Sequence, residues 1–142
     1  MHLTNFTRLA LRVLVYLTLH PVRLCSIAEI ALSYGVSRNQ LMKVVSFLAR
    51  EELVETVRGR SGGIKLAKRP TAITIGDVVR RSERLPAWRE ATRLPQASLQ
   101  SAIFHEAYAA MFDAFDASRI SDVAELSWHW FRLPDRFHQQ LV

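Results

Sequence analysis

A glycine-rich, basic turn lies between two short apolar runs in the stretch Val57-Arg58-Gly59-Arg60-Ser61-Gly62-Gly63-Ile64-Lys65-Leu66. The run before it, Leu53-Val54-Glu55-Thr56-Val57, alternates apolar and polar residues as a half-buried strand does, and residues 64–66 can pair back against it. The pattern predicts a β-hairpin with positive charge at its tip.

Two short helices joined by a tight turn are predicted immediately before this hairpin. The first begins at the capping box Ser26-Ile27-Ala28-Glu29 and the second at Ser37-Arg38-Asn39-Gln40, with Gly35 between them. Two helices joined by a short glycine-containing turn indicate a helix-turn-helix. Because a basic hairpin follows directly, the whole order predicts a winged helix.

Helical spacing of apolar residues dominates the rest of the chain. A first helix over residues 4–20 can be capped by Thr4, and a long helix is predicted over residues 98–117. The fold class expected is mainly α with a small β-hairpin. Its parts are a winged helix-turn-helix domain over residues 1–82, a connector over 83–97 and a helical C-terminal segment over 98–142.

Positive charge is concentrated in the first part of the chain. The formal net charge is +6, and residues 1–84 hold 14 lysines and arginines against 6 acidic residues. Residues 85–142 hold 5 against 7. A basic front part favours a polyanionic partner, whereas the alternative, a merely solvated surface, does not require the charge to cluster.

Cysteine usage and the start of the chain indicate the compartment. Cys25 is the only cysteine, so an intrachain disulfide and a four-cysteine zinc site are excluded. Arg8 and Arg12 interrupt the apolar pattern where a signal peptide would need an apolar core, and no apolar run is as long as a membrane span. We therefore expect a cytoplasmic protein without a membrane partner.

The start of the second helix of a helix-turn-helix enters the major groove of DNA. Arg38 suits guanine and Asn39 and Gln40 suit adenine, whereas Lys43 and the helix start at Ser37 suit phosphate. The alternative is a solvated helix face with a polar cap. Thr4 and Thr7 at the start of the first helix are expected to add phosphate contacts. The DNA contacts expected from helices are therefore Thr4, Thr7, Ser37, Arg38, Asn39, Gln40 and Lys43.

The hairpin tip supplies a second expected contact with DNA. Arg58 and Arg60 can reach a minor groove, where a narrow A·T-rich stretch concentrates negative potential, and Ser61 belongs to the same tip. Gly62 and Gly63 are expected to let the backbone turn sharply and approach another backbone. The alternative is that the arginines only keep the hairpin soluble.

Four segments of the chain resemble the NsrR-like branch of the Rrf-two family of winged-helix transcription regulators. They are residues 1–7, 35–43, 57–66 and 73–79. The resemblance covers roughly residues 1–82 and implies a dimeric DNA-binding regulator rather than an enzyme. Beyond it, the family architecture implies a short C-terminal helix near Ser121–Leu126 and a dimerisation helix with the apolar stripe Leu99, Ile103, Ala107, Ala110, Met111 and Ala114.

The connector departs from the family pattern. Sensing members carry three cysteines there, which bind an iron–sulfur cluster, but residues 85–100 contain none. In the NsrR-like branch an acidic residue of the first helix can complete the coordination, and the corresponding position holds Arg8. We therefore expect no normal iron–sulfur cluster and no other cofactor.

Cysteine and histidine residues offer two other kinds of candidate regulatory site. Cys25 directly precedes a helix whose dipole favours the thiolate, which makes it a candidate redox switch; the alternative is a small buried core residue. His105, His129 and His138 have no compact ligand spacing, so no metal site is predicted.

The combined prediction is a sequence-specific transcription regulator, a homodimeric repressor that binds double-stranded DNA at a palindromic operator. One alternative is a winged-helix module that binds another protein, and a second is a regulator that answers to an unidentified small molecule. No nucleophile–base pair, phosphate-binding loop or metal signature supports an enzyme.

Overall fold

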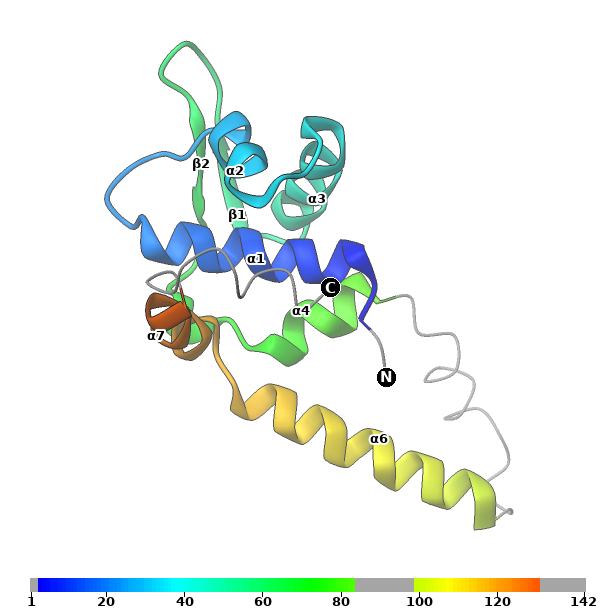
Figure 1. Cartoon of the computed structure of the whole chain (residues 1–142). Helices are drawn as coiled ribbons and strands as arrows, with labels where there is room; N and C mark the ends of the chain where they lie inside the picture. The colour runs from blue at the N-terminus through cyan, green and yellow to red at the C-terminus, as the bar shows by residue number, and fades with distance from the viewer. Residues whose placement is uncertain (1–2, 84–98, 131–142) are drawn as a thin grey trace.

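The computed structural model describes residues 3–83 and 99–130. Helix α1 packs against α3, α4 and α7, so that it lies between the helix-turn-helix and the C-terminal helices (Figure 1). The elements in chain order are α1 (Asn5–Leu19), α2 (Ile27–Tyr34), α3 (Arg38–Arg50), β1 (Val54–Val57), β2 (Gly63–Leu66), the 3-10 turn η1 (Pro70–Ala72), α4 (Ile75–Ser82), α6 (Leu99–Ala117) and α7 (Ile120–Trp130). The mainly helical fold with a two-stranded hairpin confirms the predicted fold class.

The helix starts follow the predicted caps with one exception. Ser37 and Gln40 form a complete capping box, and Gly35 ends α2 in the left-handed conformation with φ 61°. At α2 only half of the predicted box forms: Ser26 Oγ accepts the Glu29 N–H at 3.1 Å. The Glu29 carboxylate does not bond to the Ser26 N–H: one oxygen accepts from Arg23 at 2.6 Å in an ion pair, and the other accepts from the Ser26 hydroxyl at 3.3 Å.

The core forms where the apolar faces of α1, α3 and α4 meet. Leu14, Leu41 and Val78 from these three helices are fully buried. Thr7 is buried with them, and its hydroxyl donates to Ser82 Oγ at 2.8 Å, which satisfies a polar group inside the core.

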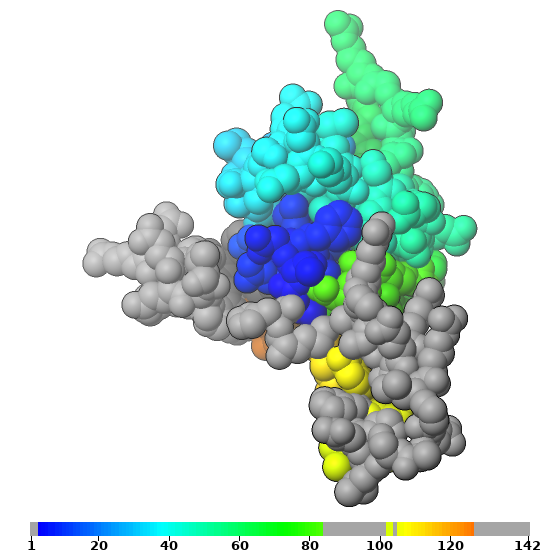
Figure 2. All heavy atoms as spheres, turned by 90° about the vertical axis from the view of Figure 1, so that its right-hand side faces the viewer, coloured from blue at the N-terminus to red at the C-terminus, as the bar shows by residue number. Residues whose placement is uncertain are grey.

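The hairpin is anchored to the start of the helix-turn-helix. Its strands are antiparallel with Thr56 opposite Ile64. Cys25 and Ile64 exchange two backbone hydrogen bonds, with N···O distances of 3.0 and 2.8 Å. A Cβ on Gly63 would lie 2.8 Å from the Cys25 carbonyl oxygen, so only glycine permits this approach. The tip projects well beyond the body of the molecule (Figure 2).

Helix α6 is joined to α4 by one charged contact. Arg80 donates to both carboxylate oxygens of Asp116, at 2.7 Å to Oδ1, and its guanidinium lies 4.3 Å from the centre of the Phe112 ring. This ion pair lowers the pKa of Asp116. A Cβ on Gly76 would lie 1.9 Å from Asp116 Oδ1, so a larger residue at this position would displace the Asp116 carboxylate from Arg80.

The opposite face of α6 is exposed. Ile103 is 58% exposed, and three alanines of the predicted apolar stripe, at 107, 110 and 114, are exposed as well. Met111 is half-buried, and the side chain of Leu99 lies outside the described part of the structure. The predicted C-terminal helix is present as α7 and is longer than expected. The predicted connector lies outside the described residues except for Glu83.

Gly76→Ala is expected to lower the free energy of unfolding by about 1 kcal/mol, because the added methyl group pushes Asp116 away from Arg80. In an Asp116→Ala background the same change should raise it by about 0.5 kcal/mol, since alanine favours a helix over glycine. Denaturant unfolding of the wild-type protein, the two single variants and the double variant measures both effects. If Gly76→Ala had the same effect in both backgrounds, position 76 would not be in contact with Asp116.

Candidate nucleic-acid interface

Burial of one side of α3 determines which side chains it presents. Leu41, Val44 and Leu48 are at most 1% exposed, so the opposite side of the helix faces solvent. The exposed residues of α3 are Arg38, Asn39, Gln40, Met42, Lys43, Ser46 and Arg50. The helix therefore presents the polar surface that the sequence predicts, together with residues that the prediction did not include.

At the start of α3 the capping box holds Gln40, one of the predicted base contacts, and leaves Arg38 and Asn39 exposed. Gln40 Oε1 accepts hydrogen bonds from the Ser37 N–H at 3.4 Å and from the Ser37 hydroxyl at 3.2 Å. A bidentate contact with adenine requires the amide oxygen as well as the amide nitrogen, so Gln40 must leave its cap to make one. Arg38 and Asn39 are exposed beside this cap and are the best placed for base contacts.

The exposed hairpin tip carries Arg58, Arg60 and Ser61. The close backbone approach predicted for Gly62 and Gly63 is confirmed, but the residue with the turn conformation is a different glycine. Gly59 has the positive φ, 114°, and its carbonyl accepts the Gly62 N–H at 3.0 Å. Gly62 and Gly63 do not have positive φ; both are needed for close packing, Gly62 against the Val57 carbonyl and Gly63 against Cys25.

The start of α1 supports only part of the expected phosphate contact. Thr4 is exposed, and its hydroxyl oxygen accepts the Thr7 N–H at 3.2 Å. Thr7 is completely buried and its hydroxyl is bonded to Ser82, so the prediction that Thr7 contacts phosphate is wrong. The packing of α4 against α1, which joins residues far apart in sequence, buries it.

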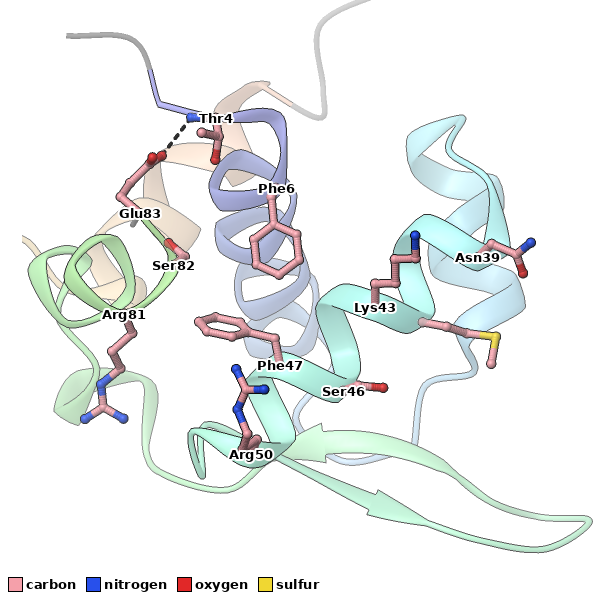
Figure 3. Close-up of a pocket in the computed structure, with 11 residues that line it drawn as sticks. Thr4, Phe6, Asn39, Lys43, Ser46, Phe47, Arg50, Arg81, Ser82 and Glu83 are labelled. Atoms are coloured by element: carbon pink, nitrogen blue, oxygen red, sulfur yellow. Dashed lines mark hydrogen bonds between the residues drawn. The ribbon is translucent and has the colours of Figure 1, made fainter. Parts of the chain in front are cut away.

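A groove of about 990 Å³ runs along the exposed face of α3 toward the ends of α1 and α4. Three cationic side chains line it: Lys43 and Arg50 from α3 and Arg81 from α4 (Figure 3). Phe6 of α1 and Phe47 of α3 contact each other edge to face, with ring centres 5.2 Å apart. Glu83, whose carboxylate accepts the Thr4 N–H at 2.7 Å, closes one end.

The predicted DNA contacts included only Thr4, Asn39 and Lys43 among the residues that line this groove. Met42, Ser46 and Arg50 lie three, seven and eleven positions after Asn39, a spacing that places them on the same helix face. Helical periodicity therefore contained a signal for them. Arg81 joins the groove only because α4 packs nearby, and its guanidinium donates to the Glu51 carbonyl at 3.0 Å.

The environment of Cys25 favours the second of its two interpretations, a small buried core residue. The residue is completely buried. Desolvation raises the pKa of its thiol and outweighs the opposing effect of Arg23. Because the thiolate is the reactive form, these observations argue against the candidate redox switch.

Within residues 3–83 and 99–130, no group of three or more histidine, cysteine or acidic side chains could hold a metal ion. His105 is exposed on α6, whereas His138 and the side chain of His129 lie outside the described residues. No helix in this part of the chain is long and apolar enough to cross a membrane.

Residues 3–126 match the model of the Rrf2 family, described as iron-dependent transcriptional regulators. The transcriptional regulator NsrR of Geobacillus kaustophilus is 39% identical over 134 residues, which cover 88% of this chain and 90% of that protein. NsrR of Bacillus licheniformis is 50% identical over 84 residues, but the match spans only 58% of this chain and 59% of that protein.

Two solved structures share this fold. The structure of T. potens IscR has a TM-score of 0.77 at 19% identity, and the match covers 98% of this chain and 96% of that one. The structure of CymR, the global cysteine regulator of B. subtilis, has a TM-score of 0.70 at 25% identity, and the match covers 89% of this chain and 98% of that one. The matching family and the NsrR relatives are transcriptional regulators and not enzymes, and this chain is an NsrR-like member of the Rrf2 family of transcription regulators.

Proposed function

We propose that this regulator is a sequence-specific DNA-binding repressor. The observation that carries the proposal is the joint exposure of two basic elements held in one rigid unit. Arg38 and Asn39 lie at the start of α3, and Arg58 and Arg60 lie at the hairpin tip. The backbone bridge between Cys25 and β2 fixes the hairpin relative to the helix-turn-helix.

Each element suits a different part of a duplex. The start of α3 suits the major groove, where Arg and Asn side chains distinguish bases. The narrow, basic hairpin suits an adjacent minor groove, where positive side chains respond to groove width. A protein bound in this way represses by occupying the operator, and this requires no additional activating surface.

We propose that the regulator acts as a homodimer through α6. The exposed stripe of this helix contains Ile103 and the small residues Ala107 and Ala110, which allow a second helix to approach closely. Burying such a surface against a second copy removes apolar area from water. Two-fold symmetry would then present two copies of α3 to two half-sites of a palindrome.

The residues present do not fit the iron–sulfur cluster of sensing family members. Thiolates are the usual ligands, and the sole cysteine is in the core beside β2. Arg8, at the position of the acidic ligand of the NsrR-like branch, is an exposed cation whose guanidinium donates to Asn5. We propose that the protein regulates transcription without a normal iron–sulfur cluster. An unidentified small molecule is the alternative to the cluster as the signal that it senses.

Replacement of Arg38 by alanine is expected to relax base preference at one position of each half-site by about tenfold or more, because the bidentate donor is lost. Operators selected from a random duplex pool by the wild-type protein provide the sequences, and fluorescence anisotropy measures Kd for each single-base variant. Arg38→Lys is the matched control that keeps the charge but loses the fork. An unchanged preference in Arg38→Ala would assign base recognition elsewhere.

Lys43→Ala is expected to weaken binding to specific and random duplexes by similar factors. The slope of log Kd against log salt concentration should decrease by about 1 for each protomer, because one phosphate contact is lost. Arg58→Ala and Arg60→Ala should each lower the preference for A·T-rich sequences beside the half-sites, because each removes a positive charge from the hairpin tip.

If the wild-type protein binds specific and random duplexes equally, the repressor proposal fails. If it shows no salt-dependent binding to DNA at all, the alternative of a protein-interaction module is favoured.

Protein purified without oxygen is expected to lack the visible absorption bands of an iron–sulfur cluster and to contain less than one iron per chain. Operator affinity should not change on exposure to nitric oxide or to an iron chelator, because no ligand set is present. Stoichiometric iron and sulfide, with affinity lost on chelation, would overturn the proposal of a cluster-free regulator.

A further inference from the structure

Met42 is an apolar side chain on the polar face of α3. It is 51% exposed, whereas Val45 and Phe47 on the same helix are buried. Core packing does not account for this placement, because half of the thioether side chain stays in water. The exposed side chain is accessible to a contact outside the protomer.

The position of Met42 on the helix narrows what that contact is. It lies four residues after Arg38 and three after Asn39, and these spacings place side chains on neighbouring parts of one helix face. Ser46 continues the same row one turn later, and all three polar residues are exposed. Met42 therefore lies next to Arg38 and Asn39, the two residues proposed to contact bases, and it lines the α3 groove together with Asn39 and Ser46.

The edges of base pairs in the major groove present polar donors and acceptors and one apolar group, the 5-methyl group of thymine. A methionine side chain is flexible and polarisable, so it can adapt to such a group and cover it from water. We propose that Met42 recognises a thymine methyl group next to the bases contacted by Arg38 and Asn39. This inference rests on the proposed DNA-binding function and specifies part of its sequence preference.

The test removes the methyl group from DNA without changing base pairing. Each thymine of the selected operator is replaced, one position at a time, by deoxyuridine, and Kd is measured for the full-length protein. At one position of each half-site the wild-type protein should lose about fourfold in affinity, the effect of one buried methyl group. Met42→Ala should bind the thymine operator about fourfold more weakly and bind the deoxyuridine operator no more weakly than the thymine one.

Val22→Ala is the matched control, since Val22 is 96% exposed but lies in the turn between α1 and α2. It should keep the full difference between thymine and deoxyuridine. Alanine is a strong helix former, so Met42→Ala leaves α3 intact. Circular dichroism and the salt dependence of nonspecific binding check this directly.

The outcomes separate this inference from the function on which it rests. Wild-type protein that binds all duplexes equally would remove the repressor proposal and this inference together. Sequence-specific binding with no sensitive thymine would overturn the assignment of Met42 alone. The same holds if Met42→Ala keeps the full deoxyuridine effect, because another residue then contacts the methyl group.

Discussion

The backbone bridge between Cys25 and Ile64 fixes how the hairpin sits beside the helix-turn-helix, and so shapes the surface proposed to bind DNA. Its two hydrogen bonds, at 3.0 and 2.8 Å, hold the hairpin against the segment that enters α2. The approach is possible because position 63 is glycine, and it buries Cys25 completely. Backbone bonds of this kind do not depend on side-chain rotamers or on ionic strength. The angle between the hairpin and α3 is consequently a property of the folded core and not of the exposed arginines.

Much of the fold could be predicted because its signals are local. The box at Ser37 and Gln40 and the left-handed Gly35 each act within a few residues, and both form as predicted. Predictions failed where a distant partner intervened. Thr7 is buried under α4 and bonds to Ser82, 75 positions away, and the Glu29 carboxylate pairs with Arg23 in place of the Ser26 N–H.

The candidate site was predictable to a similar extent. The helix-turn-helix pattern located Arg38 and Asn39, since their exposure follows from the position of the helix start. Periodicity places Met42 on the same face, but an apolar residue in an apolar-rich helix does not show by itself that it is exposed. The approach of Arg81 depends on how α4 packs, which no local pattern in the sequence specifies.

The capping box at the start of α3 limits how much sequence the proposed DNA complex could distinguish. With Ser37 and Gln40 bonded to each other, base discrimination in that complex would fall to a short row of side chains that spans about three base pairs. A specific triplet recurs roughly once in 64 base pairs of random sequence, and two such triplets at fixed spacing recur roughly once in 4,000. A genome of millions of base pairs contains many such coincidental sites. In the proposed complex, the shape of the sequences between and beside the triplets would therefore have to supply much of the selectivity.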